Sequence, residues 1–172
     1  QQADADQNIQ EKILKKIIPI LEGAPPHLSP AALADQTNQV IRAETGKDDL
    51  YREMKDLSHR RALEILNALY ALVDQGDDPL LQALKVAAAG NVIDVVHDQK
   101  DYDLWDEVIT TVNQPLSGSS VLSFRNRLKR SGPLLYLADN VGETVFDRVL
   151  IETLDAPVIY AVKSAPILND AT

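Results

Sequence analysis

The chain has 172 residues, a formal net charge of −9 and a hydrophobic fraction of 45%, enough to bury one core or two small ones. The absence of cysteine excludes disulfides, thiolate metal sites and a cysteine nucleophile, and the acidic balance argues against a general nucleic-acid binder. No apolar run reaches the ~20 residues of a membrane span and no signal peptide is visible, so the sequence predicts a soluble, cytoplasmic protein.

Helical periodicity dominates the first two-thirds of the chain. An amphipathic stripe over residues 9–21 predicts a first helix that breaks near Pro19 and ends at Gly23. Ser29-Pro30 predicts the start of a second helix, because the serine hydroxyl can cap the helix and proline is favoured in its first turn. The second helix is expected to stop at Gly46.

Further helical segments follow before the pattern changes. A long helix is predicted over about 49–75, followed by a turn at 76–79. Residues 80–96 are apolar nearly all round, which indicates a central, buried helix. Two shorter helices are predicted over 103–112 and 119–130.

Strand signals appear only near the end of the chain. Residues 134–138 form a short, continuous apolar run, typical of a parallel strand covered on both faces. A helix over 145–154 and a second strand over 157–162 complete a right-handed βαβ unit. We therefore predict an α/β protein, with a helical domain at 1–130 and the first βαβ unit of a Rossmann-like αβα sandwich at 131–172.

The predicted sheet is too small to be complete. Two parallel strands leave open edges and uncovered faces, whereas doubly wound sheets usually have about five or six strands. The chain opens with Gln1, and its only methionine is Met54. We expect a C-terminally truncated piece, whose partner is the missing C-terminal half of the same protein beyond Thr172.

Polar side chains follow both predicted strands. Asp139 and Asn140 directly follow the first strand, and Asn169 and Asp170 lie in the turn region after the second. The carboxyl ends of adjacent parallel strands share one edge, where ligands bind in open α/β sheets. Two carboxylates and two amides suit a divalent ion such as Mg²⁺ or Mn²⁺. The alternative is that both pairs are structural, as a helix cap and a turn.

Other polar residues are expected to border this edge. Gly142 allows close backbone approach, and the N-terminus of the next helix offers N–H groups to an anion. Lys163 is placed to meet a phosphate, although a solvated lysine is common at a strand end. Asn91 and Asp94 share a helix face in the most apolar segment. Their spacing alone favours a structural hydrogen-bond network, and the functional alternative is that they line the crevice between the domains.

Four stretches carry a family resemblance. LLYLADNVGETVFDRVLIETL followed by VIYAVKSAPILNDAT resembles the metal-binding core of the damage-control phosphatases, also described as acidic-residue-methyltransferase-like. AAAGNVIDVV resembles that family's Gly-Asn-x-x-Asp helix, and YREMKDLSHRRALEIL its long N-terminal helix. The resemblance implies a helical domain packed on an αβα sandwich. It also implies a metal-dependent phosphatase, activated by Mn²⁺, Co²⁺, Ni²⁺ or Mg²⁺, that acts on small phosphorylated metabolites such as sugar phosphates or damaged ones.

The resemblance also implies roles for individual residues. Asp139, Asn140 and Asp170 are the expected metal ligands, and Asp139 is the expected catalytic residue. On the resemblance, Asn91 and Asp94 border the substrate pocket. From their place near the ends of the two strands, we also expect Gly142, Glu143, Lys163 and Asn169 to bind substrate. The hypothesis is hydrolysis of a phosphate monoester by an activated water, with a covalent route through Asp139 as second choice.

Two other functions remain open on the sequence. One is a carboxyl methyltransferase that uses S-adenosylmethionine, against which the absence of a glycine-rich first loop counts. The other is a helical interaction module without catalysis, for which residues 8–130 suffice. For the protein itself, whichever function it has, we expect neither a nucleic acid nor a membrane as a partner.

Overall fold

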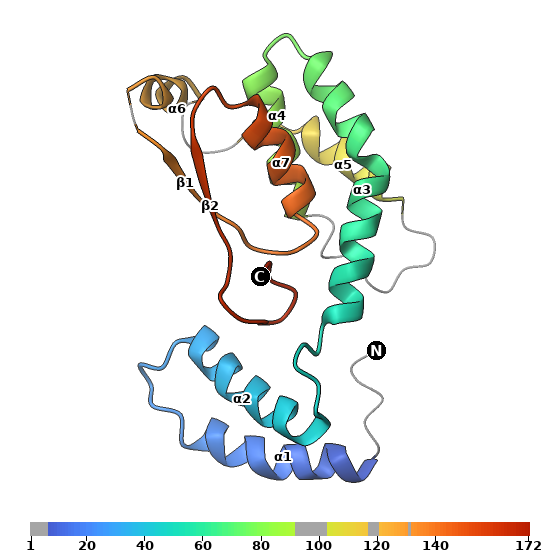
Figure 1. Cartoon of the computed structure of the whole chain (residues 1–172), viewed down its shortest axis with the longest axis vertical. Coiled ribbons are helices and arrows are strands. Elements are labelled where there is room, and N and C mark those ends of the chain that lie inside the picture. Colours follow the sequence, from blue (N-terminus) through green and yellow to red (C-terminus); the bar gives the residue numbers. More distant parts are fainter. Residues whose placement is uncertain (1–6, 92–102, 117–120, 131) are drawn as a thin grey trace. The chain divides into compact units, whose positions relative to one another are not determined.

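A computed structural model describes residues 7–91, 103–116, 121–130 and 132–172 (Figure 1). By their contacts they form two compact units. The first comprises Gln1–Arg52 with Ala165–Leu168, and the second comprises Glu53–Ser164 with Asn169–Thr172. The predicted domain boundary at residue 130, where the hydrophobic pattern changes, falls inside the second unit. No helix in the described ranges is both long and apolar enough to cross a bilayer.

The first unit is built on a hairpin of α1 (Gln7–Glu22) and α2 (Pro30–Thr45). The two ends of α2 confirm the sequence prediction. The hydroxyl of Ser29 accepts a hydrogen bond from the N–H of Ala32 at 3.2 Å. Gly46 has a left-handed φ of 67° and donates its N–H to the carbonyl of Arg42 at 2.8 Å, which closes the helix.

Pro19 does not break α1, so the predicted break is wrong. The helix continues through Glu22, and the N–H of Gly23 donates to the carbonyl of Pro19 at 3.0 Å. Proline removes its own N–H, but the residues after it can still make helical bonds. Ile17 and Ile20, on either side of Pro19, are half-buried in a helix that packs against α2, and this packing stabilises the last turn.

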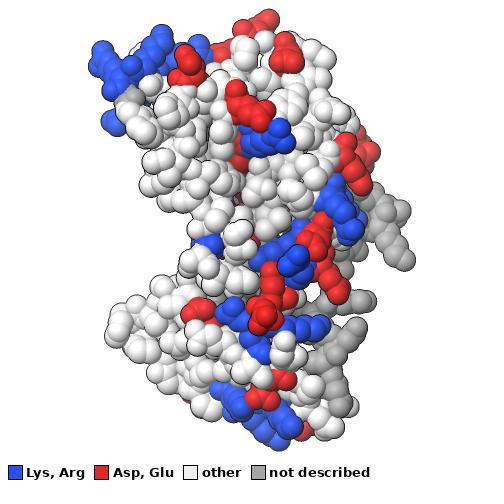
Figure 2. Space-filling model, viewed as in Figure 1, with Lys and Arg blue, Asp and Glu red and all other residues white. Residues whose placement is uncertain are grey.

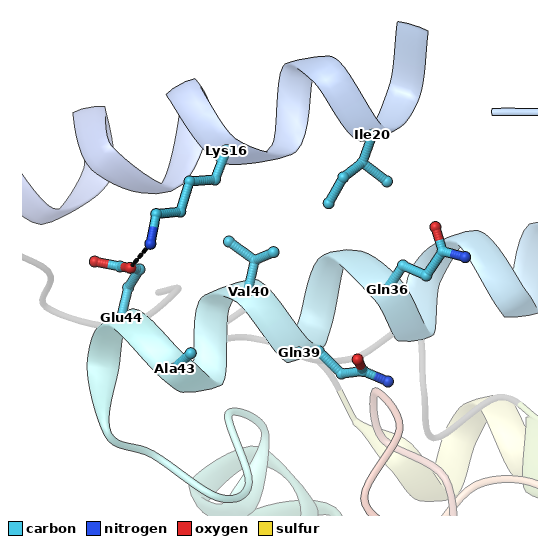
Figure 3. A pocket seen from close by; sticks show the side chains of 7 residues that line it. All are labelled: Lys16, Ile20, Gln36, Gln39, Val40, Ala43 and Glu44. Atoms are coloured by element: carbon cyan, nitrogen blue, oxygen red, sulfur yellow. Dashed lines mark hydrogen bonds and ion pairs between the residues drawn. The ribbon is translucent and has the colours of Figure 1, made fainter. Parts of the chain in front are cut away.

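An open hollow of about 430 Å³ lies between α1 and α2 (Figure 3). Its lining is Lys16, Ile20, Gln36, Gln39, Val40, Ala43 and Glu44. The Lys16 ammonium donates to the Glu44 carboxylate and joins the two helices, and this bond holds the pKa of Glu44 below its ordinary value. The hollow is bounded by aliphatic and amide side chains and one ion pair.

The second unit holds most of the remaining elements. They are α3 (Arg52–Asp74), α4 (Pro79–Ala89), α5 (Leu104–Val112), α6 (Val121–Leu128), β1 (Leu134–Leu137), α7 (Thr144–Thr153) and β2 (Val158–Ala161). Figure 2 shows basic side chains gathered at the α6 end of this unit. On α6 itself, Arg125 binds the carboxylate of Asp78 at 2.6 Å, and Asp78 also caps the start of α4. That arginine therefore has a structural role.

α4 is shorter than the sequence predicted. The apolar pattern indicated a helix over 80–96; the α-helix ends at Ala89, Gly90 follows it with a right-handed φ of −55° and ψ of −32°, and residues 92–96 lie outside the described residues. The N–H of Gly90 donates to the carbonyl of Ala87, which is the tighter 3₁₀ type of bond that commonly closes an α-helix. The four buried residues of α4 confirm that this helix is central, and they pack mainly against α7 and α5: Ala83, Val86, Ala87 and Ala89.

The two strands pair in parallel, as predicted, with Leu134 opposite Val158 and Leu137 opposite Ala161. α7 connects them and lies along one face of the sheet (Figure 1). On the opposite face Leu135, Leu137 and Ile159 are 59%, 72% and 56% exposed. Within the described residues α7 covers one face of the sheet, and the other face carries these exposed side chains, as expected for two strands of a larger sheet.

A buried carboxylate joins α7 to both strands. Asp147 is 3% exposed, and Tyr136 and Tyr160 stand opposite one another in the strand register. Their hydroxyls donate to different oxygens of Asp147, that of Tyr160 at 2.7 Å, and their rings stack with centroids 5.4 Å apart. Burial raises the pKa of Asp147, and the two hydroxyl donors oppose part of that rise.

We expect the burial of Asp147 to make stability pH-dependent. Folding raises the pKa of Asp147, so the protonated form of this residue stabilises the folded state. Its contribution to the free energy of unfolding is complete below the pKa of Asp147 in the unfolded chain, and it is lost as the pH rises through the pKa in the folded protein. The free energy of unfolding, measured in urea at several pH values, should therefore decrease as the pH increases through this range. The slope should be flatter for Asp147→Asn, because an amide does not titrate.

The exposed acid Asp155 supplies the control for this measurement. Asp155→Asn should keep the pH slope of the unaltered protein. The same slope in Asp147→Asn would show that the buried carboxylate does not control stability in this range.

Candidate functional site

The segments that follow the two strands lie side by side. Asn140 and Asp170 form an antiparallel bridge. The N–H of Ala171 donates to the carbonyl of Asp139 at 2.7 Å, and the N–H of Val141 donates to the carbonyl of Asn169 at 2.9 Å. The structure thus brings together, through their backbones, the two polar pairs predicted to follow neighbouring strands.

The amide of Asn140 is oriented by a buried acid. Its Nδ2 donates to Oε1 of Glu143 at 2.7 Å, and Glu143 is 7% exposed. Glu143 stands at the N-cap of α7 but makes no capping bond with its side chain. The hydrogen bond uses the nitrogen of the Asn140 amide and leaves its oxygen, Oδ1, as the atom for a further partner.

Asp170 already has a cationic neighbour. The Nζ atom of Lys163 lies 3.4 Å from its Oδ2, and the side chains are 43% and 13% exposed, respectively. Partly exposed ion pairs contribute at most about 1 kcal/mol, so this pair can yield to a stronger ligand. Asp139 is exposed, and Asn140 and Asp170 are half-buried.

The start of α7 offers fewer donors than the sequence suggested. Gly142 is buried in the turn before the helix. The N–H of Thr144 donates to the carbonyl of Val141 at 3.3 Å, and that of Phe146 donates to the carbonyl of Glu143 at 2.9 Å. Two of the first-turn N–H groups are therefore already bonded within the turn, and the positive end of the helix lies next to the Glu143 carboxylate.

Asn91 is placed differently from the prediction. It is exposed, just past the end of α4, so it is not a buried amide on a helix face. Asp94 lies outside the described residues. The link to the site is Gly90, where a Cβ atom would stand 3.4 Å from the Cα of Glu143. Asn91 thus follows directly on the residue that touches the Asn140–Glu143 turn.

The donors at this edge fit a hard divalent cation in chemical type. Asp139, Asn140 and Asp170 offer two carboxylates and an amide oxygen, and Mg²⁺ commonly binds one or two carboxylates and keeps several waters. No group of three or more His, Cys, Asp or Glu side chains in the described ranges is arranged to hold a metal ion. A cation here therefore depends on the amide oxygen and on water as well as on the two acids.

Comparison with known proteins identifies the relatives of this chain. A family model for the damage-control phosphatase ARMT1-like domain matches residues 1–172. Damage-control phosphatase PH1575 of Pyrococcus horikoshii is 34% identical over 131 residues, which are 74% of this chain and 45% of that protein. A damage-control phosphatase of Archaeoglobus fulgidus is 28% identical over 150 residues, 83% of this chain and 51% of that protein.

A solved structure extends the comparison to the fold. The crystal structure of a DUF89 family protein from Pyrococcus horikoshii matches with a TM-score of 0.83 and 28% identity. The match covers 97% of this chain and 59% of that chain. This chain therefore shares its mixed arrangement of helices and a small parallel sheet with that protein, and it spans about half the length of the curated relatives it matches.

The close approach at Gly90 can be tested by adding a methyl group. In Gly90→Ala the new Cβ atom would lie 3.2 Å from the Cβ of Phe146, which is fully buried. We expect a loss of about 1–3 kcal/mol in the free energy of unfolding, as for other overpacked sites, measured in urea.

Gly132 provides the matched control, because a Cβ atom there would meet nothing within 4 Å. Gly132→Ala should change the stability by less than about 0.5 kcal/mol. Equal stability of Gly90→Ala and the unaltered protein would contradict a tight contact between α4 and the turn before α7.

Proposed function

The chain belongs to the family of damage-control phosphatase ARMT1-like domains, and from this premise we propose that it carries the metal-binding edge of a metal-dependent phosphatase. Two of its relatives are named damage-control phosphatases, which supports a hydrolase. The observation that carries the proposal is the bridge between Asn140 and Asp170, which joins the polar ends of two adjacent parallel strands. Open α/β sheets bind their ligands at this edge.

In this proposal Asp139, Asn140 and Asp170 hold one divalent cation, which is Mn²⁺, Co²⁺, Ni²⁺ or Mg²⁺. The bound ion would neutralise charge on a phosphoryl oxygen and lower the pKa of the attacking water. Glu143 keeps the Asn140 oxygen available by binding its amide nitrogen. Water is the proposed nucleophile, because an attack by Asp139 would withdraw one of only two carboxylates from the cation.

The substrate is proposed to be a small phosphate monoester, such as a sugar phosphate or a damaged phosphometabolite. Lys163, 3.4 Å from Asp170, is the cation that we expect to contact the phosphate. Asn169 and the turn at Gly142 border the same edge, and Asn91 adjoins that turn through Gly90. The site serves a metabolite of the cytoplasm in this proposal, and the activity belongs to the whole protein of which these residues are the metal-binding edge.

Removal of the acids tests the proposed ligands. Asp139→Asn and Asp170→Asn should each raise the dissociation constant for Mn²⁺ by more than about 100-fold, beyond the 10–100-fold typical of losing a residue that only supports a ligand. Titration calorimetry measures this in the 172-residue chain. The same two variants of the whole protein should also hydrolyse p-nitrophenyl phosphate more slowly in the presence of Mn²⁺.

Asp155→Asn, which removes an exposed acid of the same unit, controls for the change in net charge and should leave both values unaltered. If the two ligand variants bind Mn²⁺ and hydrolyse the ester as the unaltered protein does, the metal-dependent phosphatase proposal is wrong.

The role of Glu143 can be separated from its charge. Glu143→Ala removes the acceptor that holds Asn140, so we expect a rise of about 10–100-fold in the dissociation constant for Mn²⁺. Glu143→Gln retains an oxygen that can accept from Asn140 Nδ2, so its loss of affinity should be clearly smaller. Equal losses in both variants would indicate that the negative charge matters and the hydrogen bond does not.

A further inference from the structure

A loop at residues 164–170 carries one of the proposed metal ligands, and both of its ends are fixed by backbone bonds. The N–H of Lys163 donates to the carbonyl of Ala171 at 2.9 Å, which closes the base of the loop. The N–H of Val141 donates to the carbonyl of Asn169 at 2.9 Å, which ties the returning end to the segment after β1. Figure 1 shows the chain leaving β2, turning and coming back. Asp170 therefore stands at the returning end of this loop, next to the segment after β1.

The tip of the loop, Ala165–Leu168, belongs to the first compact unit. There, Nη1 of Arg42 donates to the carbonyl of Pro166 at 3.2 Å. Nη2 of the same guanidinium lies 3.5 Å from Oδ1 of Asp35, and the Arg42 side chain is 22% exposed. A planar guanidinium can serve two acceptors at once in a fixed geometry, which a lysine ammonium does not reproduce.

The tip lies beside a small, partly open space next to Arg42. Its volume is about 10 Å³, and it is lined by Asn38, Arg42, Asp48, Asp49, Leu50, Tyr51, Pro166 and Leu168. A cavity of that size is at most about one water molecule's probe volume. Pro166 and Leu168 of the tip thus lie close to α2, where Asn38 is 8% exposed.

Backbone strain occurs at the point where the tip returns. Leu168 has a φ of 46° and is the one non-glycine residue with positive φ in the described ranges. The left-handed conformation costs about 1–2 kcal/mol for such a residue, so it persists only where the surroundings impose it. Leu168 directly precedes Asn169 and Asp170, and its turn sets the direction in which these two residues leave the tip.

We infer that Arg42 is a positioning residue for the proposed metal ligand Asp170. By holding the carbonyl of Pro166, Arg42 imposes the left-handed turn at Leu168 and so delivers Asn169 and Asp170 to the segment after β1. This inference rests on the proposed metal site, because its consequence is an effect of Arg42 on metal affinity. Arg42 is 128 positions before Asp170 in the chain and acts through the backbone of the loop.

The first experiment replaces Arg42 in the 172-residue chain. Arg42→Ala should speed hydrogen exchange at the amides of Val141 and Ala171, because the returning end of the loop, which carries the acceptor of Val141 (the Asn169 carbonyl) and the donor Ala171 itself, loses a fixed position. It should also raise the dissociation constant for Mn²⁺ by about 10-fold, at the low end for a residue that supports a ligand. Arg42→Lys should give an intermediate loss. Lys16→Ala removes another cation of the same unit, away from the loop tip, and should change neither quantity.

A second pair of variants tests the strained turn without touching Arg42. Leu168 is 40% exposed, so the protein should fold with either replacement. Asparagine adopts left-handed φ several times more often than most residues, whereas β-branched residues avoid it. Leu168→Asn should therefore keep the Mn²⁺ affinity, and Leu168→Val should weaken it by about the same 10-fold factor as Arg42→Ala.

The outcomes separate this inference from the proposed function. If the unaltered protein binds no Mn²⁺, the proposed function fails, and this inference fails with it. If the unaltered protein binds Mn²⁺ but Arg42→Ala and Leu168→Val bind it equally well, the inference alone is overturned, even where exchange at Val141 is faster. Faster exchange together with weaker Mn²⁺ binding in both variants, and in neither control, supports it.

Discussion

The arrangement of the α/β part depends on one buried carboxylate. Asp147 accepts hydrogen bonds from Tyr136 and Tyr160, which face each other from the two strands. Burial of a charge is unfavourable, and hydrogen bonds to an ionised acceptor are among the stronger ones, so both hydroxyls are needed to offset the loss of water. Because a one-residue slip would point either tyrosine to the opposite face, this contact holds the register of the strands. The register in turn sets where the strands end, and therefore where Asp139 and Asp170 meet.

Much of the fold could be predicted because its signals are local. Ser29, Gly46 and the apolar run at 134–138 each carry a recognisable pattern within a few residues, and the structure confirms the elements that they indicated. The pairing of the strand ends was also predictable, since adjacent parallel strands share one edge. The error at Pro19 arises because packing against α2 keeps the helix intact past a proline, and α4 closes in a 3₁₀ turn that its apolar periodicity does not indicate.

The remaining features of the site could not be predicted because they join distant parts of the chain. The bond between Arg42 and Pro166 spans 124 positions, and no spacing rule indicates it. Asp147 lies within an apolar helical pattern, where a single acid is usually assigned to the solvent face. The Asn140–Glu143 bond is different, because a separation of three residues at a helix start is a local signal for side-chain pairing, and the sequence pattern indicated these residues without indicating their contact.

The bare face of the two-stranded sheet has a consequence for handling the protein. Among the described residues, Leu135, Leu137 and Ile159 present an exposed aliphatic strip on a two-stranded sheet, which is the kind of surface that promotes self-association. Each strand is flanked by a proline and a charged residue, which oppose aggregation: Pro133 and Asp139 flank the first strand, and Pro157 and Lys163 flank the second. Asp139 and Lys163, to which we assign roles in the proposed site, therefore also oppose aggregation. Neutralising either residue will make the protein more prone to aggregate.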